Sequence, residues 1–483
     1  MPAGKRFFSV IFSTAALGLI IAGCGGSGSR PTPQGGFTTA SLNGTYAFSF
    51  SGTDFSNVTF FAVAGTMTLD GAGHVTSGGL DLNRATGVSP NVALTGTYNI
   101  KADGRGTAIL NTSLGNLNLV FVVISNQHAL VVRFENSATG SGTMDLSNSG
   151  AFSTTALAGS FAFNLSGADS SGNPEATLGS LTLDNSGTLS AGVQDVVDST
   201  IVLPNQPISA GTLTIAPTGR GTLAMTTSIG TLNFAIYPVS TNFFKAVEID
   251  TNLSQLAGDV FRQQGPFNNT VLNGPFAFTA AGVDQNAAAN VVEGGIFTAS
   301  GTGVIASGTE DLNDGAFVPS PGVAISGSYS ISGLRGTLTL SGTNFSDSFV
   351  FYPSTGGIQL MEIDSGVVLS GVAFQQSGTF SNTSIQGAYG VNLTGPGLDF
   401  TAAVNANGAG AFSGIFDSNN AGSLGPGAPI TGTYTIGASG RGPMSFSSGL
   451  GPQSLAVYVV NNTQALFVDL DPGLPAQGQM QHQ

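Results

Sequence analysis

The chain has 483 residues, of which 41% are hydrophobic, 8% are charged and 71 are glycine. This much hydrophobic surface can bury several domain cores, and the low charge excludes the composition typical of disordered chains. The formal net charge is −14, from 12 basic and 26 acidic residues. This balance excludes nucleic acid as a partner and excludes a polybasic membrane patch, because both need clustered lysine and arginine.

Residues 1–24 have the layout of a secretory signal peptide. Lys5 and Arg6 precede an apolar run over residues 7–21, which is too short for a comfortable transmembrane helix. The stretch from Ile21 to Cys24 resembles a bacterial lipobox, which implies cleavage before Cys24 and lipidation of its sulfur. The resemblance implies an exported protein, anchored by lipid to the bacterial membrane. Gly25 is not the aspartate that tends to hold such proteins at the inner membrane, so the outer membrane or cell surface is favoured.

Cys24 is the single cysteine of the chain, so an intramolecular disulfide and a thiolate metal cage are excluded. Residues 25–36 are rich in glycine, serine and proline and lack apolar periodicity. This composition predicts a flexible tether between the lipid and whatever follows.

Four copies of one unit follow the tether. The phrase that runs from Leu42 to Phe48 returns in similar form at Leu157, Leu272 and Ile385, so the spacing between successive starts is nearly constant. A phenylalanine precedes each start at one fixed distance, and an arginine beside glycine recurs in every copy. A fixed period of this kind indicates a tandem repeat. We place the repeats at residues 37–150, 151–265, 266–378 and 379–483.

The local signals within one unit are all β. Short runs rich in Val, Ile, Thr, Phe and Tyr alternate with turns of Gly, Asn and Asp, and Asp70-Gly-Ala-Gly73 is a strong hairpin signal. No window after the signal shows a helical period. In the first unit about eight strands are predicted, at residues 44–51, 60–69, 74–83, 92–101, 105–112, 117–125, 129–135 and 140–146.

Eight sequential hairpin strands can close into an up-and-down antiparallel barrel, which removes exposed sheet edges. A β-sandwich is the alternative. The opening pattern of Phe37, Leu42, Gly44 and Tyr46 resembles the start of lipocalin-type barrels, and this implies that a short coil and the phenylalanine close one end of each barrel. The short linkers predict a semi-rigid rod or a compact string of four barrels.

Because charges are scarce, those that recur in every unit are informative. Each unit carries an acid, then an arginine, then a second acid, and the spacings between the three are nearly the same in all units. An arginine fork can hold two carboxylates by charge-assisted hydrogen bonds. We therefore expect a structural clasp within each unit, made of Asp81, Arg105 and Glu135; Asp195, Arg220 and Glu248; Asp311, Arg335 and Glu362; and Asp417, Arg441 and Asp469.

The alternative to a clasp is a carboxylate pair for acid–base chemistry. A catalytic pair would not need four copies, and no activated nucleophile accompanies it. His74, His128 and His482 show no zinc spacing, and the turn at Asp70 holds too few acids for calcium. The sequence therefore predicts no catalytic residue, no metal and no cofactor.

The leading hypothesis is a non-enzymatic, lipid-anchored cell-envelope protein with a structural, adhesive or interaction role toward an unidentified envelope or extracellular partner. The alternative is lipocalin-like binding of a small apolar ligand inside each β unit, and an exported hydrolase is a third reading without supporting residues. The barrel interior discriminates between the first two. Inward positions such as Phe48, Phe61, Val63 and Tyr98 either fill the lumen or line a cavity of roughly 300 Å³ or more.

Overall fold

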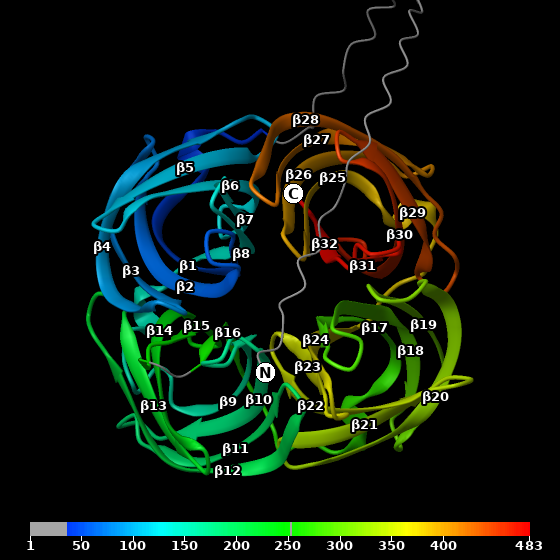
Figure 1. Ribbon diagram of the computed structural model, residues 1–483, viewed down its shortest axis with the longest axis horizontal. Coiled ribbons are helices and arrows are strands. Elements are labelled where there is room, and N and C mark those ends of the chain that lie inside the picture. The colour runs from blue at the N-terminus through cyan, green and yellow to red at the C-terminus, as the bar shows by residue number, and fades with distance from the viewer. Residues whose placement is uncertain (1–35, 252–253) are drawn as a thin grey trace, which may run out of the picture. The chain divides into compact units, whose positions relative to one another are not determined.

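In the computed structural model of the chain, the described residues are 36–251 and 254–483. They form four closed antiparallel barrels of eight strands each, and Figure 1 shows each barrel nearly end-on as a closed round of arrows. The prediction of an all-β fold made of tandem up-and-down barrels is confirmed, and the sandwich alternative is wrong. The predicted signal peptide, its Cys24 and tether residues 25–35 lie outside the described residues. No helix of the described part is long and apolar enough to span a bilayer.

Each barrel is a meander whose last strand pairs with its first. Barrel 1 comprises β1 (Asn43–Asp54), β2 (Thr59–Asp70), β3 (His74–Arg84), β4 (Gly87–Ile100), β5 (Arg105–Thr112), β6 (Gly115–Ser125), β7 (His128–Glu135) and β8 (Ala138–Leu146). Barrel 2 comprises β9 (Gly159–Ala168), β10 (Pro174–Leu183), β11 (Leu189–Asp198), β12 (Ile201–Ile215), β13 (Gly221–Thr227), β14 (Gly230–Ser240), β15 (Phe243–Glu248) and β16 (Gln255–Arg262).

The second half of the chain repeats this plan. Barrel 3 comprises β17 (Asn273–Asp284), β18 (Ala289–Ser300), β19 (Val304–Asp314), β20 (Ser320–Ser332), β21 (Arg335–Ser341), β22 (Ser346–Ser354), β23 (Gly357–Glu362) and β24 (Val367–Gln375). Barrel 4 comprises β25 (Gln386–Gly395), β26 (Leu398–Asn407), β27 (Ala411–Asn420), β28 (Ser423–Tyr434), β29 (Arg441–Ser448), β30 (Gly451–Asn461), β31 (Gln464–Asp469) and β32 (Gln477–His482).

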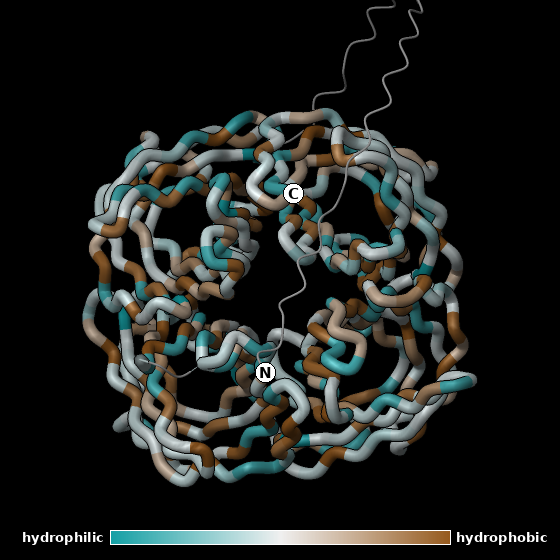
Figure 2. Tube along the Cα trace, viewed as in Figure 1, coloured by the Kyte–Doolittle hydropathy of each residue, from teal (hydrophilic) through white to brown (hydrophobic). Residues whose placement is uncertain are grey.

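Turn chemistry explains why the strands reverse where they do. Between β2 and β3, the Asp70 carboxylate accepts hydrogen bonds from the amides of Ala72 at 2.7 Å and His74 at 2.9 Å. Gly71 and Gly73 adopt φ values of +72° and +105°, which side chains rarely tolerate. The alternation of hydrophobic and polar residues along the strands, visible in Figure 2, then sends one face of each strand inward.

A short 3₁₀ turn precedes the first strand of every barrel. These turns are η1 (Thr39–Ser41), η2 (Ser149–Ala151), η3 (Asn269–Val271) and η4 (Asn382–Ser384). The recurring phenylalanine at the start of each unit is partly buried against the core of its own barrel, at Phe37, Phe152, Phe267 and Phe380. Coil and phenylalanine thus pack on each barrel before its first strand begins.

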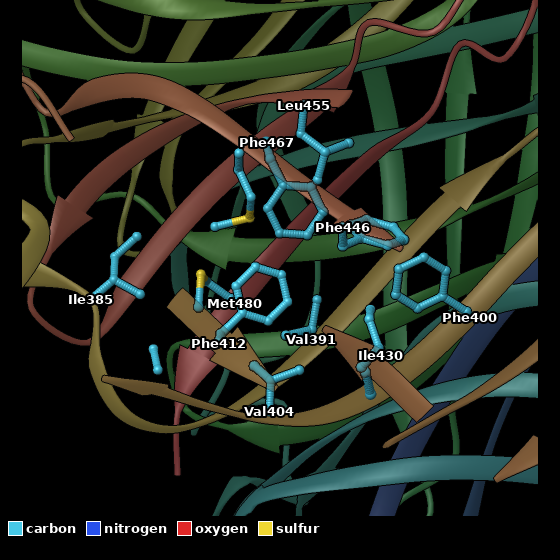
Figure 3. A pocket seen from close by; sticks show the side chains of 13 residues that line it. Ile385, Val391, Phe400, Val404, Phe412, Ile430, Phe446, Leu455, Phe467 and Met480 are labelled. Carbon is cyan, nitrogen blue, oxygen red and sulfur yellow. The ribbon is translucent and has the colours of Figure 1, made fainter. Parts of the chain in front are cut away.

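Side chains fill the barrels. In barrel 1 the residues Phe48, Phe61, Val63 and Tyr98 are all buried in one hydrophobic core. The cavity inside barrel 4 has a volume of about 20 Å³ and a wholly apolar lining, and Figure 3 shows phenylalanine, leucine, isoleucine and methionine side chains crowding it. Such a space is far smaller than the roughly 300–1,000 Å³ of a small-molecule pocket.

The barrels contact one another in a closed cycle. Separate hydrophobic clusters join barrel 1 to barrel 2, barrel 2 to barrel 3, barrel 3 to barrel 4, and barrel 4 to barrel 1. The contact between the last and the first barrel is incompatible with a semi-rigid rod, so that expectation is wrong, and the compact string of barrels closes on itself. The outer walls of the barrels explain why neighbouring barrels pack together. In β1 and β2, Ala47, Ala62 and Ala64 point away from the core of barrel 1 and are nevertheless fully buried, against barrel 2.

Candidate functional site

One arginine in each barrel stands at the tight turn that leads into the fifth strand. Arg105, Arg335 and Arg441 are the first residues of β5, β21 and β29, and Arg220 directly precedes β13. The residue before Arg105 is Gly104, whose φ of +87° lies in the left-handed region. The turn directs the guanidinium away from its own barrel.

Each of these arginines binds the recurring aspartate of a neighbouring barrel. Arg220 of barrel 2 donates from Nε and Nη2 to Asp81 of barrel 1, both at 2.8 Å. The hydrogen bonds to Asp81 raise the pKa of Arg220 above its ordinary value. The other pairs are Arg335 with Asp195, Arg441 with Asp311, and Arg105 with Asp417. Together they join barrels 2 and 1, 3 and 2, 4 and 3, and 1 and 4.

The clasp predicted within each unit is therefore wrong. The recurring arginine does pair with the recurring aspartate, but the two partners belong to neighbouring barrels. In β3, Leu80 and Leu82 face the barrel core while Asp81 lies between them on the outer wall, as the alternation of a strand requires. An outward aspartate faces the next barrel, so the arginine that reaches it comes from that barrel. The pairing of Asp81 is with Arg220 and not with Arg105.

The second acids of the predicted clasp do not bind these arginines. Strand pairing places Glu248, Glu362 and Asp469 opposite Phe234, Phe349 and Leu455. The residue at the matching place in barrel 1 is Arg133, opposite Leu119. Glu135 instead binds Arg133, with 2.7 Å between Nη2 and Oε2. These positions point into the barrels, which removes them from the contacts between barrels.

Backbone amides complete the coordination of the four aspartates. The Asn91 amide donates to Asp81 at 2.9 Å, and the amides of Asn205, Gly322 and Gly427 donate to the corresponding aspartates at 2.7 to 2.8 Å. All four donors have positive φ values, between +49° and +72°. Asp81 is fully buried, and a buried carboxylate costs free energy unless its oxygens are hydrogen-bonded. The amide and the arginine together supply those bonds.

A tyrosine that our reading of the sequence missed joins three of the four sites. Tyr237 donates its hydroxyl to Asp81, and Tyr352 donates to Asp195 at 2.6 Å. Burial, followed by the charge of Asp81, raises the pKa of Tyr237 well above its ordinary value, so the hydroxyl keeps the proton that it donates. The signal was present in the sequence, because a tyrosine follows three of the arginines at one fixed spacing, at Tyr237, Tyr352 and Tyr458.

The contact between barrels 4 and 1 has a different chemistry. Val122 occupies the place of the tyrosine, at the same spacing from Arg105. In place of the tyrosine contact, Arg105 binds a second acid. Its Nε donates to Asp103 at 2.9 Å, and its Nη1 donates to Asp417 at 2.9 Å. This arginine is 4% exposed, so the pair that closes the cycle is also well buried.

Side-chain amides bridge the same contacts. Asn83 of barrel 1 donates to the carbonyls of Glu248 and Ser254 in barrel 2, at 2.9 and 3.0 Å. Gln483 donates to the carbonyls of Asp103 and Val123 in barrel 1, at 3.1 and 2.8 Å. Asn313, Asn419, Gln263 and Gln376 make the equivalent bonds elsewhere. Each interface thus combines apolar packing, a buried ion pair and hydrogen-bonded amide groups.

A cavity of about 580 Å³ is lined by residues from all four barrels. Its walls are rich in side-chain amides and hydroxyls, with a few phenylalanines. The amide residues are Asn164, Asn392, Gln359, Gln464, Gln477, Gln479 and Gln481. The amide oxygen of Asn392 is buried without a hydrogen-bond partner among the described residues.

A charged network borders this cavity. Lys245, fully buried, lies 2.9 Å from an oxygen of Asp145 and 3.6 Å from one of Asp259. His128 Nδ1 lies 2.7 Å from the other oxygen of Asp145. Burial opposes the charge of Lys245, but the two carboxylates outweigh it and raise the pKa of the lysine. Burial likewise would raise the pKa of Asp145, yet Lys245 and His128 lower it.

Lys245 and Asp145 therefore hold their charges, while burial raises the pKa of Asp259, the third member of the network. A lysine with a raised pKa stays an ammonium ion, and an aspartate with a lowered pKa stays a carboxylate. Among residues 36–251 and 254–483, no hydroxyl or thiol group is hydrogen-bonded to a histidine ring, so none is activated as a nucleophile by a histidine base. The walls of the cavity therefore offer hydrogen-bond donors and acceptors, and the fixed charges of Lys245 and Asp145 lie at its border.

Comparison with known proteins adds no family to this description, because no protein-family model matches the chain and no curated protein is significantly similar to it.

Proposed function

We propose that this chain is a non-enzymatic, lipid-anchored cell-envelope protein whose four barrels act together as one rigid interaction body. The observation that carries the proposal is the closed cycle of four buried arginine–aspartate pairs between neighbouring barrels. Each contact joins two different surfaces, and contacts of that kind close into a cycle when the rotation between units allows it. A body held in this way keeps its outer surfaces in fixed relative positions.

The proposed location in the cell envelope rests on the lipobox resemblance at residues 21–24. Acyl chains contribute about 0.8 kcal/mol per buried CH₂ group, and more than one chain is needed for stable anchoring. The formal net charge of −14 argues against nucleic acid as the partner of this interaction body, because binding to phosphates needs clustered lysine and arginine.

The lipocalin-type resemblance would favour an apolar ligand inside each barrel. The coil and phenylalanine at the start of each barrel agree with the resemblance. The filled interiors weigh against the ligand, since the cavity in barrel 4 is about 20 Å³, whereas ligand pockets commonly measure about 300–1,000 Å³.

A second candidate function is the binding of a neutral polar ligand in the cavity between the barrels. Its volume of about 580 Å³ falls within the usual range for small-molecule sites. Amide side chains offer donors and acceptors together, which suits a molecule rich in hydroxyl groups.

Two measurements test the main proposal. Cells that produce the chain with Cys24→Ala should lose it from the membrane fraction and lose incorporation of labelled palmitate. The wild-type protein should bind washed, delipidated envelope from its own host, and a variant with both Asp81→Ala and Asp417→Ala should bind it less. Retention of the Cys24→Ala protein in the membrane fraction, or absence of envelope binding by the wild type, would contradict the proposal.

A further inference from the structure

Five carboxylates come together inside barrel 3. They belong to Glu293 of β18, Glu310 of β19, Asp347 of β22, Glu362 of β23, and Asp364 just beyond β23. Carboxylate oxygens of Glu293, Glu310 and Asp347 all lie within 4.8 Å of one another. Oxygens of Asp347, Glu362 and Asp364 meet the same limit, so Asp347 belongs to both groups.

The strands aim these acids inward. Glu310 precedes Asp311, whose side chain points outward to Arg441 of barrel 4, so Glu310 points toward the lumen. Glu362 pairs with Phe349, a member of the core of barrel 3. The acids therefore share the interior of the barrel with its hydrophobic core.

No basic side chain pairs with these acids within the described part of the chain. None of the ion pairs among the described residues includes any of the five acids. Glu293 and Glu310 are 3% and 2% exposed, and Oε1 of the first and Oε2 of the second have no hydrogen-bond partner among residues 36–251 and 254–483. The Ser348 amide donates to Asp364 at 2.7 Å, at the outer end of the cluster. Buried acceptors without a partner are rare and call for one.

We propose that this cluster is a binding site for a calcium ion. Calcium bonds to oxygen at about 2.3–2.6 Å, so one ion can bridge oxygens that lie up to about 4.8 Å apart. The donor set is entirely oxygen, which favours a hard cation over zinc or copper. Asp347 and Asp364 are partly exposed, and they leave an entry route and room for the water ligands that complete a shell of about six to eight oxygens.

The other barrels supply their own controls. The positions that correspond to Glu293, Glu310, Asp347 and Glu362 are defined by strand pairing. In the same order, the four positions of barrel 1 are occupied by Val63, Leu80, Leu117 and Arg133. Those of barrel 2 are occupied by Thr177, Gln194, Leu232 and Glu248. Those of barrel 4 are occupied by Phe400, Phe416, Gln453 and Asp469. Barrels 2 and 4 thus place one acid at these four positions and barrel 1 places none, so the cluster is particular to barrel 3.

The test uses the full chain, purified in detergent from its own host and stripped with a chelator. Equilibrium dialysis against labelled Ca²⁺ and scanning calorimetry with and without Ca²⁺ are measured for the wild type, for Glu293→Gln with Glu310→Gln, and for Asp469→Asn. We expect one bound Ca²⁺ and a raised unfolding temperature for the wild type and for Asp469→Asn. We expect the glutamine pair to lose at least about 10-fold in affinity, because it removes two of the charged ligands.

Folding of the glutamine variant is checked in the same experiment. Without Ca²⁺ it should melt at or above the temperature of the wild type, because glutamine keeps the shape of glutamate and removes repulsion between buried like charges. Absence of Ca²⁺ binding by the wild type at about 10 mM, beyond the usual range of extracellular sites, would overturn the proposal. Unchanged affinity in the glutamine variant would overturn it as well.

Discussion

The ion pair between Arg220 and Asp81 offers the sharpest test of how the barrels are joined. Asp81 is fully buried, and Arg220 supplies two of its hydrogen bonds at 2.8 Å. In Arg220→Ala the carboxylate keeps the bonds from Tyr237 and from the Asn91 amide but loses its cation. Breaking a buried pair by removing one partner costs about 3–5 kcal/mol. We expect the lower part of that range, since the arginine side chain is 23% exposed.

A double-mutant cycle shows which aspartate, Asp81 or Asp195, is coupled to Arg220 in the free energy of unfolding. Urea unfolding is measured for Arg220→Ala, Asp81→Asn and Asp195→Asn, and for the two double variants that contain Arg220→Ala. We expect a coupling free energy of about 2–3 kcal/mol between Arg220 and Asp81, which are in direct contact. Between Arg220 and Asp195, which belong to the same barrel, the effects should add to within about 0.5 kcal/mol.

The pattern of coupling decides between two arrangements. A clasp within barrel 2 would couple Arg220 to Asp195, and separate barrels on a string would couple it to neither. Either result would refute the closed cycle of contacts. Amide hydrogen exchange of the Arg220→Ala protein adds an independent readout, because opening of this contact should reduce protection of β2 in barrel 1 as well as β14 in barrel 2.

Three further predictions concern the buried polar groups. Tyr352→Phe should lower the free energy of unfolding by about 1–3 kcal/mol, because Asp195 loses a buried donor, and urea titration measures the loss. Burial, followed by the charge of Glu175, raises the pKa of Glu248 to about 9. The native state therefore holds a proton that the unfolded state releases near its ordinary pKa of 4.5, so this contribution is present at low pH and is lost as the pH rises toward 9. Glu248→Gln should flatten that decline. Lys245→Met should destabilise the protein near neutral pH by leaving Asp145 without its cation, and should weaken the loss of stability below about pH 4 that a lowered carboxylate pKa produces.

Each of these predictions has an outcome that contradicts it. Equal stability of Tyr352→Phe and the wild type would mean that the hydroxyl contributes nothing to the contact. An unchanged slope of stability against pH between about pH 5 and 9 in Glu248→Gln would show that this acid is ionised in the native state. For Lys245→Met, full stability at pH 7 would remove the lysine from the network around the cavity.

Much of the fold can be predicted from the sequence because its elements are local. The turn from Asp70 to Gly73 fixes one hairpin through its own side chain and its left-handed glycines, and the alternation along strands such as β4 fixes which face points inward. Closure into a barrel removes both edges of such a meander, although the sequence left a β-sandwich as the alternative. Whether inward residues such as Phe48 fill the lumen or line a cavity was decided by the structure, in which Phe48 is fully buried in the core of barrel 1.

Some features were visible in the sequence and were missed. Tyrosine recurs at a fixed spacing after three of the arginines, and Arg133 keeps the spacing from Arg105 that Glu248 keeps from Arg220. The runs at 60–67 in β2 and 117–124 in β6 are apolar at nearly every position. A strand that is apolar on both faces is buried on both faces, so these runs mark the contacts between barrels.

The partner of each arginine could be decided by the tertiary structure alone. All four units carry the same aspartate and the same arginine, so pairing within a unit and pairing between units leave identical marks in the sequence. The choice depends on the rotation between adjacent barrels, which is set by how the alanine face of β1 and β2 fits the face of β14 and β15. The acids of barrel 3 come together for a similar reason. They are scattered along the chain from Glu293 to Asp364, and the closure of the barrel brings them to one place.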